Sequence, residues 1–340
     1  MADFVVRLAT VVLLLAFASW VSLSATIVLG RLWYDRTHRD RVRALPPREA
    51  RRLLRRAARR GRTDWGQSRS ASALSRLTRA GHPAARRLVR RALADPDPER
   101  AAAAARSLGD LGDEWAIDLL LEALRAGHVQ RSRVAAQLER LAPLPGAQLL
   151  PLLHDADPAV RFWGATLLAP YPELGQAALV ESTCDDEPNV RAAAVETLGG
   201  RGGDGAGEAA LALLEDPAWF VRVHAARSAG RIVGAPAAPA IARLLSDQRW
   251  WVRTAAKDAL RDLGQAAIPA LVPVLVAADE FARNGAAEIL QDIGFVDYLA
   301  DEEPSSTLLA RIYAAGGDRL RIAAELRSKT SLPVEQAEAA

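Results

Sequence analysis

Apolar side chains recur at the spacing of an α-helix along most of the chain. A first kind of segment places Val190, Ala194, Val195 and Leu198 on one helical face. A second kind follows a glycine or proline, as in GEAALALLEDP (207–217) and GQAAIPALVPVLVAAD (264–279). The two kinds alternate, so the pattern predicts helical hairpins: two helices joined by a short turn.

The hairpins repeat with a period close to 30 residues. Four units begin with an aspartate six residues before an arginine, a valine directly before that arginine, and a glycine or alanine three residues after it. Successive arginines are 30, 31 and 31 residues apart, and the pairs are Asp155 and Arg161, Asp185 and Arg191, Asp216 and Arg222, and Asp247 and Arg253. A fixed period of this length predicts an all-α fold, a right-handed α-solenoid of stacked hairpins.

The repeated arginine lies close to the start of its helix, where the helix dipole disfavours a cation. In the copy at 216–230, we expect Asp216 to cap the helix and Pro217 to be its first residue. Stacking brings equivalent loops side by side, so the aspartate of one unit faces the arginine of its neighbour. We expect these eight residues to form a structural Asp–Arg ladder. The alternative is that the arginines bind an anion.

These features resemble the HEAT-repeat family, in particular the short bacterial units of the phycobilisome-lyase-like type. The resemblance rests on the D-x5-R spacing, the V-R-x-x-A core and the closing Leu-Gly, recurring in register over residues 95–294. It implies a solenoid over 64–328, with atypical end units, that presents a long surface to protein partners. We expect residues 329–340 to be a disordered tail.

The N-terminal part of the chain predicts a membrane anchor. After a short flank (1–7), residues 8–30 are 23 residues without a charge, which as a helix span about 34 Å. The alternative is a signal peptide cleaved near Ala25.

Charge gives the expected orientation. The segment 31–63 is rich in arginine, with 13 Arg and three acids in 31–62, which resists translocation. The chain is therefore expected to be a single-pass protein of the inner (cytoplasmic) membrane, with its N-terminus outside and the solenoid in the cytoplasm. Six arginines at helical spacing are expected to face anionic lipid: Arg51, Arg52, Arg55, Arg56, Arg59 and Arg60. The alternative is a solvated charge run.

Candidate chemistry is sparse. Five scattered histidines form no zinc motif, and the single cysteine, Cys184, excludes an intrachain disulfide. The glycine-rich stretch 199–207 lacks the lysine of a phosphate loop and is expected to be a turn. We therefore predict no catalytic residue, cofactor or metal.

Aromatic residues are the most unusual feature of the repeats. They occur two and three residues before successive repeat arginines, and stacking would align them into a strip: Trp219, Phe220, Trp250, Trp251 and Phe281. Packing of the helix starts and between repeats would account for these residues. The functional alternative is a partner-binding strip, because Trp and Phe are typical interface anchors.

The function expected from these features is a membrane-anchored HEAT-repeat scaffold or adaptor, not an enzyme. It would bind a protein partner, such as a membrane-associated complex, at the cytoplasmic face. One alternative is an enzyme or chaperone like the bilin lyases. Another is a nucleic-acid-binding solenoid, which the net charge of −13 over residues 92–340 disfavours.

Overall fold

The computed structural model describes residues 83–141, 144 and 146–316, and every regular element in this part of the chain is helical. The all-α fold class is therefore confirmed. The predicted membrane span (8–30), the Arg-rich segment with its six lipid-facing arginines and the tail (329–340) lie outside the described residues. The chain forms two compact units, Met1–Leu144 and Pro145–Ala340, which are described separately.

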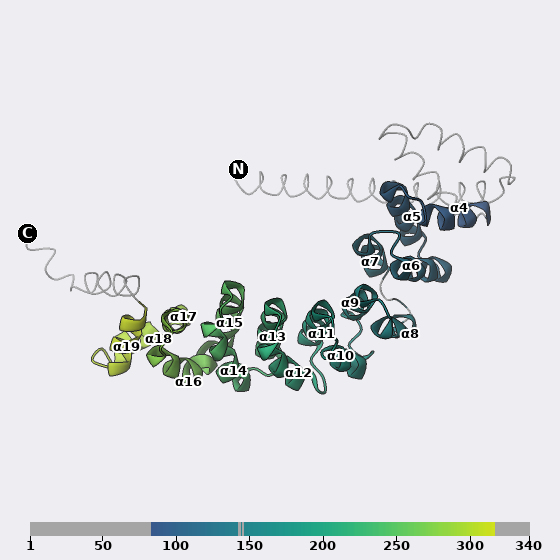
Figure 1. The fold of residues 1–340 in the computed structure, drawn as a ribbon. Helices are drawn as coiled ribbons and strands as arrows, with labels where there is room; N and C mark the ends of the chain where they lie inside the picture. The colour runs from purple at the N-terminus through teal and green to yellow at the C-terminus, as the bar shows by residue number, and fades with distance from the viewer. Residues whose placement is uncertain (1–82, 142–143, 145, 317–340) are drawn as a thin grey trace, which may run out of the picture. The chain divides into compact units, whose positions relative to one another are not determined.

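The first unit contains four described helices (Figure 1): α4 (Pro83–Leu93), α5 (Pro98–Leu111), α6 (Glu114–Ala126) and α7 (Arg131–Arg140). Asp97 and Asp113 cap α5 and α6 by accepting hydrogen bonds from backbone N–H groups in their first turns. Both helices end at a glycine in the left-handed conformation. Helix α5 packs against α4, α6 and α7, and leucines and alanines fill the space between them.

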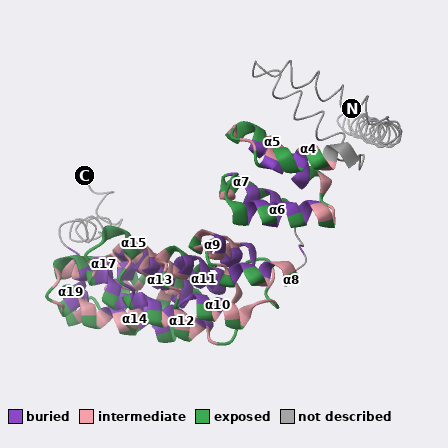
Figure 2. Ribbon diagram, turned by 45° about the vertical axis from the view of Figure 1, so that its right-hand side comes forward, coloured by how far each residue is buried: buried purple, intermediate pink, exposed green. Residues whose placement is uncertain are grey.

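The second unit has two layers of helices (Figures 1 and 2). The first layer, which carries the repeat arginines, contains α9 (Pro158–Leu167), α11 (Pro188–Arg201), α13 (Trp219–Ile232), α15 (Trp250–Leu263) and α17 (Glu280–Asp292). The second layer is shorter and partly 3-10: α8 (Gly146–Leu149) with η1 (Leu150–His154), α10 (Gln176–Ser182), α12 (Ala206–Ala212) with η2 (Leu213–Glu215), η3 (Ala235–Ala237), α14 (Ala238–Arg243), η4 (Leu244–Ser246), η5 (Gly264–Ala267), α16 (Ile268–Leu271), η6 (Val272–Val276) and α18 (Phe295–Glu302). Helix α19 (Thr307–Ala315) packs against α17.

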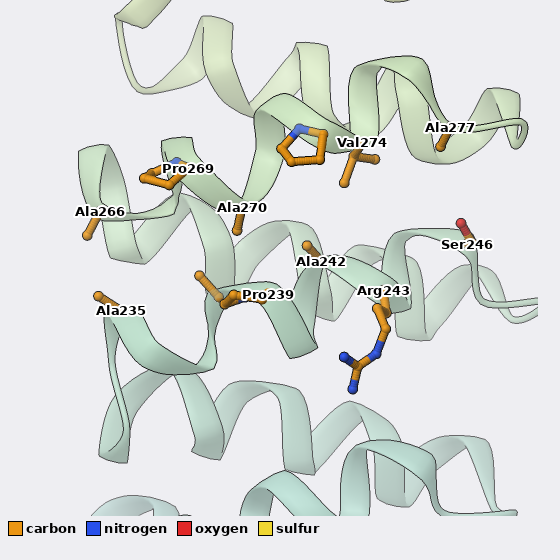
Figure 3. Close-up of a pocket in the computed structure, with 12 residues that line it drawn as sticks. Ala235, Pro239, Ala242, Arg243, Ser246, Ala266, Pro269, Ala270, Val274 and Ala277 are labelled. Carbon is orange, nitrogen blue, oxygen red and sulfur yellow. The ribbon is translucent and has the colours of Figure 1, made fainter.

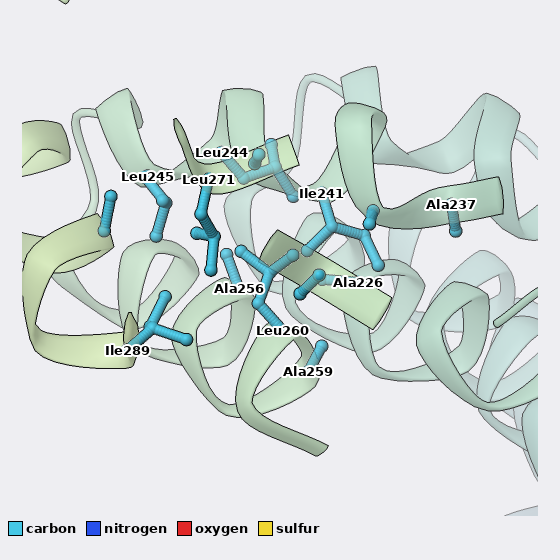
Figure 4. Close-up of a cluster of buried hydrophobic side chains, with 14 of the residues drawn as sticks. Ala226, Ala237, Ile241, Leu244, Leu245, Ala256, Ala259, Leu260, Leu271 and Ile289 are labelled. Atoms are coloured by element: carbon cyan, nitrogen blue, oxygen red, sulfur yellow. The ribbon is translucent and has the colours of Figure 1, made fainter. Parts of the chain in front are cut away.

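The core of the second unit lies between its two layers (Figure 4). Large side chains of the second layer, such as Ile241 and Leu245, are fully buried against small residues of the first layer, such as Ala226 and Ala256. The small residues let successive first-layer helices approach closely.

Gly199 shows how close this approach is. A Cβ atom at this position would lie 2.8 Å from Cβ and 3.1 Å from Cα of Ser228 on the next first-layer helix. The Ser228 hydroxyl crosses the same interface and donates to the carbonyl of Val195 at 2.8 Å.

Helix α13 begins later than the sequence predicts. Helix α13 begins at Trp219 with Ala218 as its N-cap, so the prediction that Asp216 caps the helix and Pro217 opens it is wrong. The reason is a turn in the loop, where Asp216 Oδ1 accepts the N–H of Ala218 at 2.8 Å. The aspartate is thereby placed before the helix, where it can meet a neighbouring unit.

Within the described residues, one stretch, Trp250–Val276, is long and apolar enough to cross a membrane by length and composition, with a hydropathy of 1.4. It is one hairpin of the repeat: the chain turns at Gly264, whose φ is +60°, and the two arms lie in different layers. We therefore assign this stretch to the folded unit.

Candidate partner-binding surface

Three arginines of the first layer each form a salt bridge with the aspartate that precedes the next first-layer helix. Both contacts are short in every pair: Nε–Oδ2 and Nη2–Oδ1 are 2.7 and 2.8 Å for Arg161–Asp185, 2.7 and 3.0 Å for Arg191–Asp216, and 2.8 and 3.0 Å for Arg222–Asp247. Such bidentate pairs fix geometry as well as charge. The bonds always run from one unit to the following one.

The remaining nitrogen of each arginine holds its own loop. Nη1 of Arg191 donates to the carbonyls of Asp185 at 2.7 Å and Asp186 at 3.2 Å, and the same bonds recur at Arg161, Arg222, Arg253 and Arg283. These carbonyls and the partner carboxylate together offset the unfavourable dipole at the helix start. The loop geometry thus explains a cation at this position.

The ladder residues are largely withdrawn from water. The side chains of Arg191 and Asp216 are 13% and 3% exposed. The hydrogen bond from Arg161 lowers the pKa of Asp185, against the opposing effect of burial. The hydrogen bonds that Arg161 and Arg191 donate to the ladder aspartates likewise raise the pKa of both arginines. We call the Nε and Nη2 groups of each repeat arginine its fork. Because the forks of Arg161, Arg191 and Arg222 each bind a carboxylate, these three arginines are not free to bind another anion.

The two ends of the predicted ladder differ from its middle. Arg161 reaches Asp155 through that residue's backbone carbonyl, at 2.9 Å. Arg253 bonds the carbonyls of Asp247 and Gln248 but reaches no carboxylate among the described residues. Its guanidinium instead lies over the ring of Phe281, 4.9 Å from the centroid.

The aromatic residues divide into exposed and packed members. Trp219, Trp250, Trp251 and Phe281 are 37%, 56%, 59% and 68% exposed. Phe220 is partly buried and packs against the core, so it does not belong to the exposed set. The ring–ring contacts here join neighbouring residues at the start of the same helix. The ring centroids of Trp250 and Trp251 lie 4.6 Å apart and those of Trp219 and Phe220 lie 5.8 Å apart, both pairs edge to face.

A pocket of about 230 Å³ lies beside the exposed aromatic residues, between α15 and α17. Its lining includes Trp250, Arg253, Phe281 and a salt bridge from Lys257 Nζ to Glu288 Oε2 at 2.8 Å. Sequence reasoning missed Lys257 and Glu288. The sequence feature that could have indicated the pocket is Gly285. It occupies the repeat position at which an earlier copy has the larger His224, and its missing side chain leaves space at the helix surface.

A second, larger hollow lies in the second layer (Figure 3). It measures about 610 Å³ and lies between α14 and α16, beside their contact. Small residues and prolines of two consecutive repeats line it, with Arg243 and Ser246 at one end: Ala235, Ala238, Pro239, Ala242, Ala266, Pro269, Ala270, Pro273, Val274 and Ala277. Sequence reasoning did not predict this groove.

Titratable side chains outside the ladder offer little chemistry. Within the part of the chain that the structure describes, no group of three or more His, Cys, Asp or Glu residues is placed to hold a metal ion. Burial lowers the pKa of His224, against the opposing charge of Glu196 at 3.4 Å. His224 is therefore a neutral, half-buried side chain near pH 7.

Comparison with known proteins identifies the repeat. The sequence matches the family described as HEAT repeats over residues 52–139, 146–222, 173–261 and 207–291, so the sequence resemblance is confirmed. The first of these matches begins inside the segment 31–63 that the sequence assigns to the membrane surface. None of the curated proteins compared with the chain matches its sequence.

Solved structures share the fold. Kap121p bound to Pho4p is 14% identical, with a TM-score of 0.54, over 82% of this chain and 39% of that chain. Kap121p bound to RanGTP gives 14% identity and a TM-score of 0.52 over the same shares. The CpcE–CpcF complex of phycocyanin lyase from Nostoc sp. PCC7120 is 20% identical over 68% of this chain and 93% of that chain, with a TM-score of only 0.38. The chain thus spans well under half of Kap121p, and the likeness extends to the α-solenoid fold alone.

Proposed function

This chain belongs to the HEAT-repeat family, and we propose that it is a scaffold that captures protein partners on the first layer of its second unit. The observation that carries the proposal is the exposure of Trp219, Trp250, Trp251 and Phe281, between 37% and 68%, at three successive helix starts. Large rings left in water contribute little to folding, but Trp and Phe are typical anchors of protein interfaces. The Kap121p neighbours, which are bound to Pho4p and to RanGTP, use the same fold with protein partners.

We propose further that residues 8–30 anchor the scaffold in the inner membrane with the repeats in the cytoplasm. The support is the sequence: 23 uncharged residues followed by the Arg-rich segment 31–63. A tether raises the effective concentration of the exposed aromatic residues near membrane-bound partners. The partner is accordingly a membrane-associated protein complex, and the arginines from Arg51 to Arg60 face anionic lipid.

The capture surface is tested by photo-crosslinking in native membranes. A benzophenone amino acid replaces Arg249, which is exposed and precedes Trp250; the matched control carries it at Glu208, exposed on the second layer. We expect a discrete protein adduct from position 249 only, which disappears when Trp250→Ser and Trp251→Ser are added. Equal adducts from both positions, or adducts that survive the tryptophan changes, would refute this surface.

The anchor is tested by carbonate extraction and protease access. The full chain should stay in the membrane fraction, and a C-terminal tag should be cleaved only after the cells are permeabilised. Release by carbonate would exclude the span.

The two alternative functions have direct tests on the full chain. A shift in the visible absorption of an added bilin would indicate a lyase-like role and would contradict the scaffold function. Retention of nucleic acid in a filter-binding assay at physiological salt would favour the nucleic-acid-binding solenoid.

A further inference from the structure

The Asp–Arg ladder stops at Arg253. Every earlier fork from Arg161 to Arg222 holds the aspartate of the next loop, but the next loop carries Ala277 in the equivalent place, six residues before Arg283. Among the described residues, Nε and Nη2 of Arg253 therefore meet no carboxylate, while Nη1 makes its usual bonds of 2.8 and 3.3 Å to the loop carbonyls. The arginine is held in position by these bonds and by the ring of Phe281, whose centroid lies 4.9 Å from the guanidinium carbon, while the described residues offer no carboxylate to Nε and Nη2.

The loop around Ala277 keeps the shape that presents a carboxylate. The backbone of Ala277 has φ −61° and ψ 154°. The corresponding angles are −64° and 143° at Asp247, and −58° and 139° at Asp216. Only the carboxylate itself is missing, so a carboxylate from another molecule would find the remaining half of the pair already placed.

The interface next to Arg253 is more open than the others. Helix α15 packs less closely on α17 than on α13, and the pocket of about 230 Å³ lies in the resulting space. Gly285 contributes to this opening, because a Cβ there would make only ordinary contacts, 3.5 Å from Lys257 Cδ and 3.6 Å from Leu245 Cδ2.

The charge of Arg253 and the exposed rings beside the pocket indicate what kind of group it can bind. Lys257 is neutralised by Glu288 at 2.8 Å, whereas the charge of Arg253 is not matched by a bonded carboxylate. Trp250 and Phe281, both more than half exposed, border the pocket. A ligand that fits has a carboxylate for the fork and an adjacent apolar group for the rings.

We propose that this pocket takes an aspartate or glutamate side chain of a protein partner, which completes the ladder at Arg253 while a neighbouring apolar residue packs on Trp250 and Phe281. The inference rests on the proposed function, because it specifies the chemistry by which the exposed aromatic surface recognises its partner.

A built-in competitor provides the test. Ala277→Asp supplies the missing carboxylate from within the chain, and Ala278→Asp is the matched control, adding the same charge one residue further on at an exposed position. We expect Ala277→Asp, but not Ala278→Asp, to raise the melting temperature of the full chain in detergent. Identical melting of the two variants would show that the fork does not accept a carboxylate and would overturn the proposal.

Binding is measured with random dodecapeptides displayed on phage and selected on the full chain. We expect the selected peptides to share an acidic residue next to an apolar one. Their affinity should fall about tenfold or more on Ala277→Asp, and equally when the acid becomes its amide. Gly285→Leu, which fills the pocket without touching the fork, should weaken them as well.

The outcomes separate the two proposals. Selected peptides without an acid, no selected peptides at all, or equal binding to Ala277→Asp and Ala278→Asp would sink the carboxylate site. If the crosslinked membrane partner binds the Ala277→Asp variant normally, the scaffold function survives and this inference fails. If acidic peptides bind as expected but position 249 yields no adduct in membranes, the site stands and the proposed function fails.

Discussion

The guanidinium of Arg191 grips the carboxylate of Asp216 in the next repeat, with Nε–Oδ2 and Nη2–Oδ1 distances of 2.7 and 3.0 Å. The same two side chains also hold their own loops, since Arg191 donates to the carbonyl of Asp185 and Asp216 accepts from the N–H of Ala218. One pair therefore links two loops and the starts of two helices.

Removal of Arg191 should destabilise the second unit. Arg191→Ala leaves Asp216, whose side chain is 3% exposed, without its cation, and we expect a loss of about 1–3 kcal/mol in the free energy of unfolding. Urea denaturation measures it, with Arg231→Ala as the control: Arg231 is exposed, lies on the next first-layer helix, and should cost less than about 0.5 kcal/mol. A double-mutant cycle with Asp216→Asn that yields no coupling would contradict the ladder's structural role.

Two adjacent glycines should respond oppositely to alanine. Gly199→Ala forces a Cβ against Ser228 and should cost about 1–3 kcal/mol. Gly200 lies in the same helix with nothing within 4 Å of a built Cβ, so Gly200→Ala should stabilise by up to about 1 kcal/mol. Thermal melts of the two variants are compared directly. Equal shifts would mean that α11 and α13 do not approach as closely as described.

Acid should weaken the ladder in a defined direction. The pKa of Asp185 is lowered in the fold, chiefly by its hydrogen bond from Arg161. Its stabilising contribution is therefore complete above its ordinary pKa of 3.8 and is lost as pH falls through the lower folded value. We expect the wild type to lose more stability than Asp185→Asn in denaturant titrations from pH 5 downward. Parallel curves for the two proteins would exclude this linkage.

Phe220 and Trp251 hold the same place in successive repeats but should have different energetic roles. Phe220 is partly buried and packs against the core, so Phe220→Ala should cost about 1–3 kcal/mol. Trp251 is 59% exposed, and Trp251→Ser should change stability by less than about 0.5 kcal/mol. Chemical denaturation distinguishes them. A large loss at Trp251 would assign it to packing and remove the main support for a capture surface.

Much of the second unit could be predicted from spacing alone. The period of the Asp and Arg residues defines the hairpins, and stacking then brings Arg191 to the carboxylate of the following loop. The start of α13 was mispredicted because Asp216 turns the loop instead of capping the helix.

The features that depend on packing distance could not be predicted from the sequence. Identical repeat positions hold a packed Phe220 and an exposed Trp251, and the difference accompanies the looser contact of α15 with α17. Ala277 is visible in the sequence as an exception, but its meaning depends on knowing that the earlier repeat arginines pair with the aspartate at this place in the following loop.

The ladder also affects how the second unit deforms. Its charged bonds link the successive loops before α11, α13 and α15, whereas a groove lined by Ala242 and Pro273 lies between α14 and α16. We therefore expect an elastic change in curvature to pivot on the linked loops and to open or close the groove between α14 and α16. Among the described residues the row of Asp–Arg pairs ends with Arg222–Asp247, and α15 is linked to α17 away from the loops, by Lys257–Glu288 and Arg261–Asp292. We therefore expect the loop ends of the last hairpins to open most easily, at the place where Arg253 lacks a carboxylate.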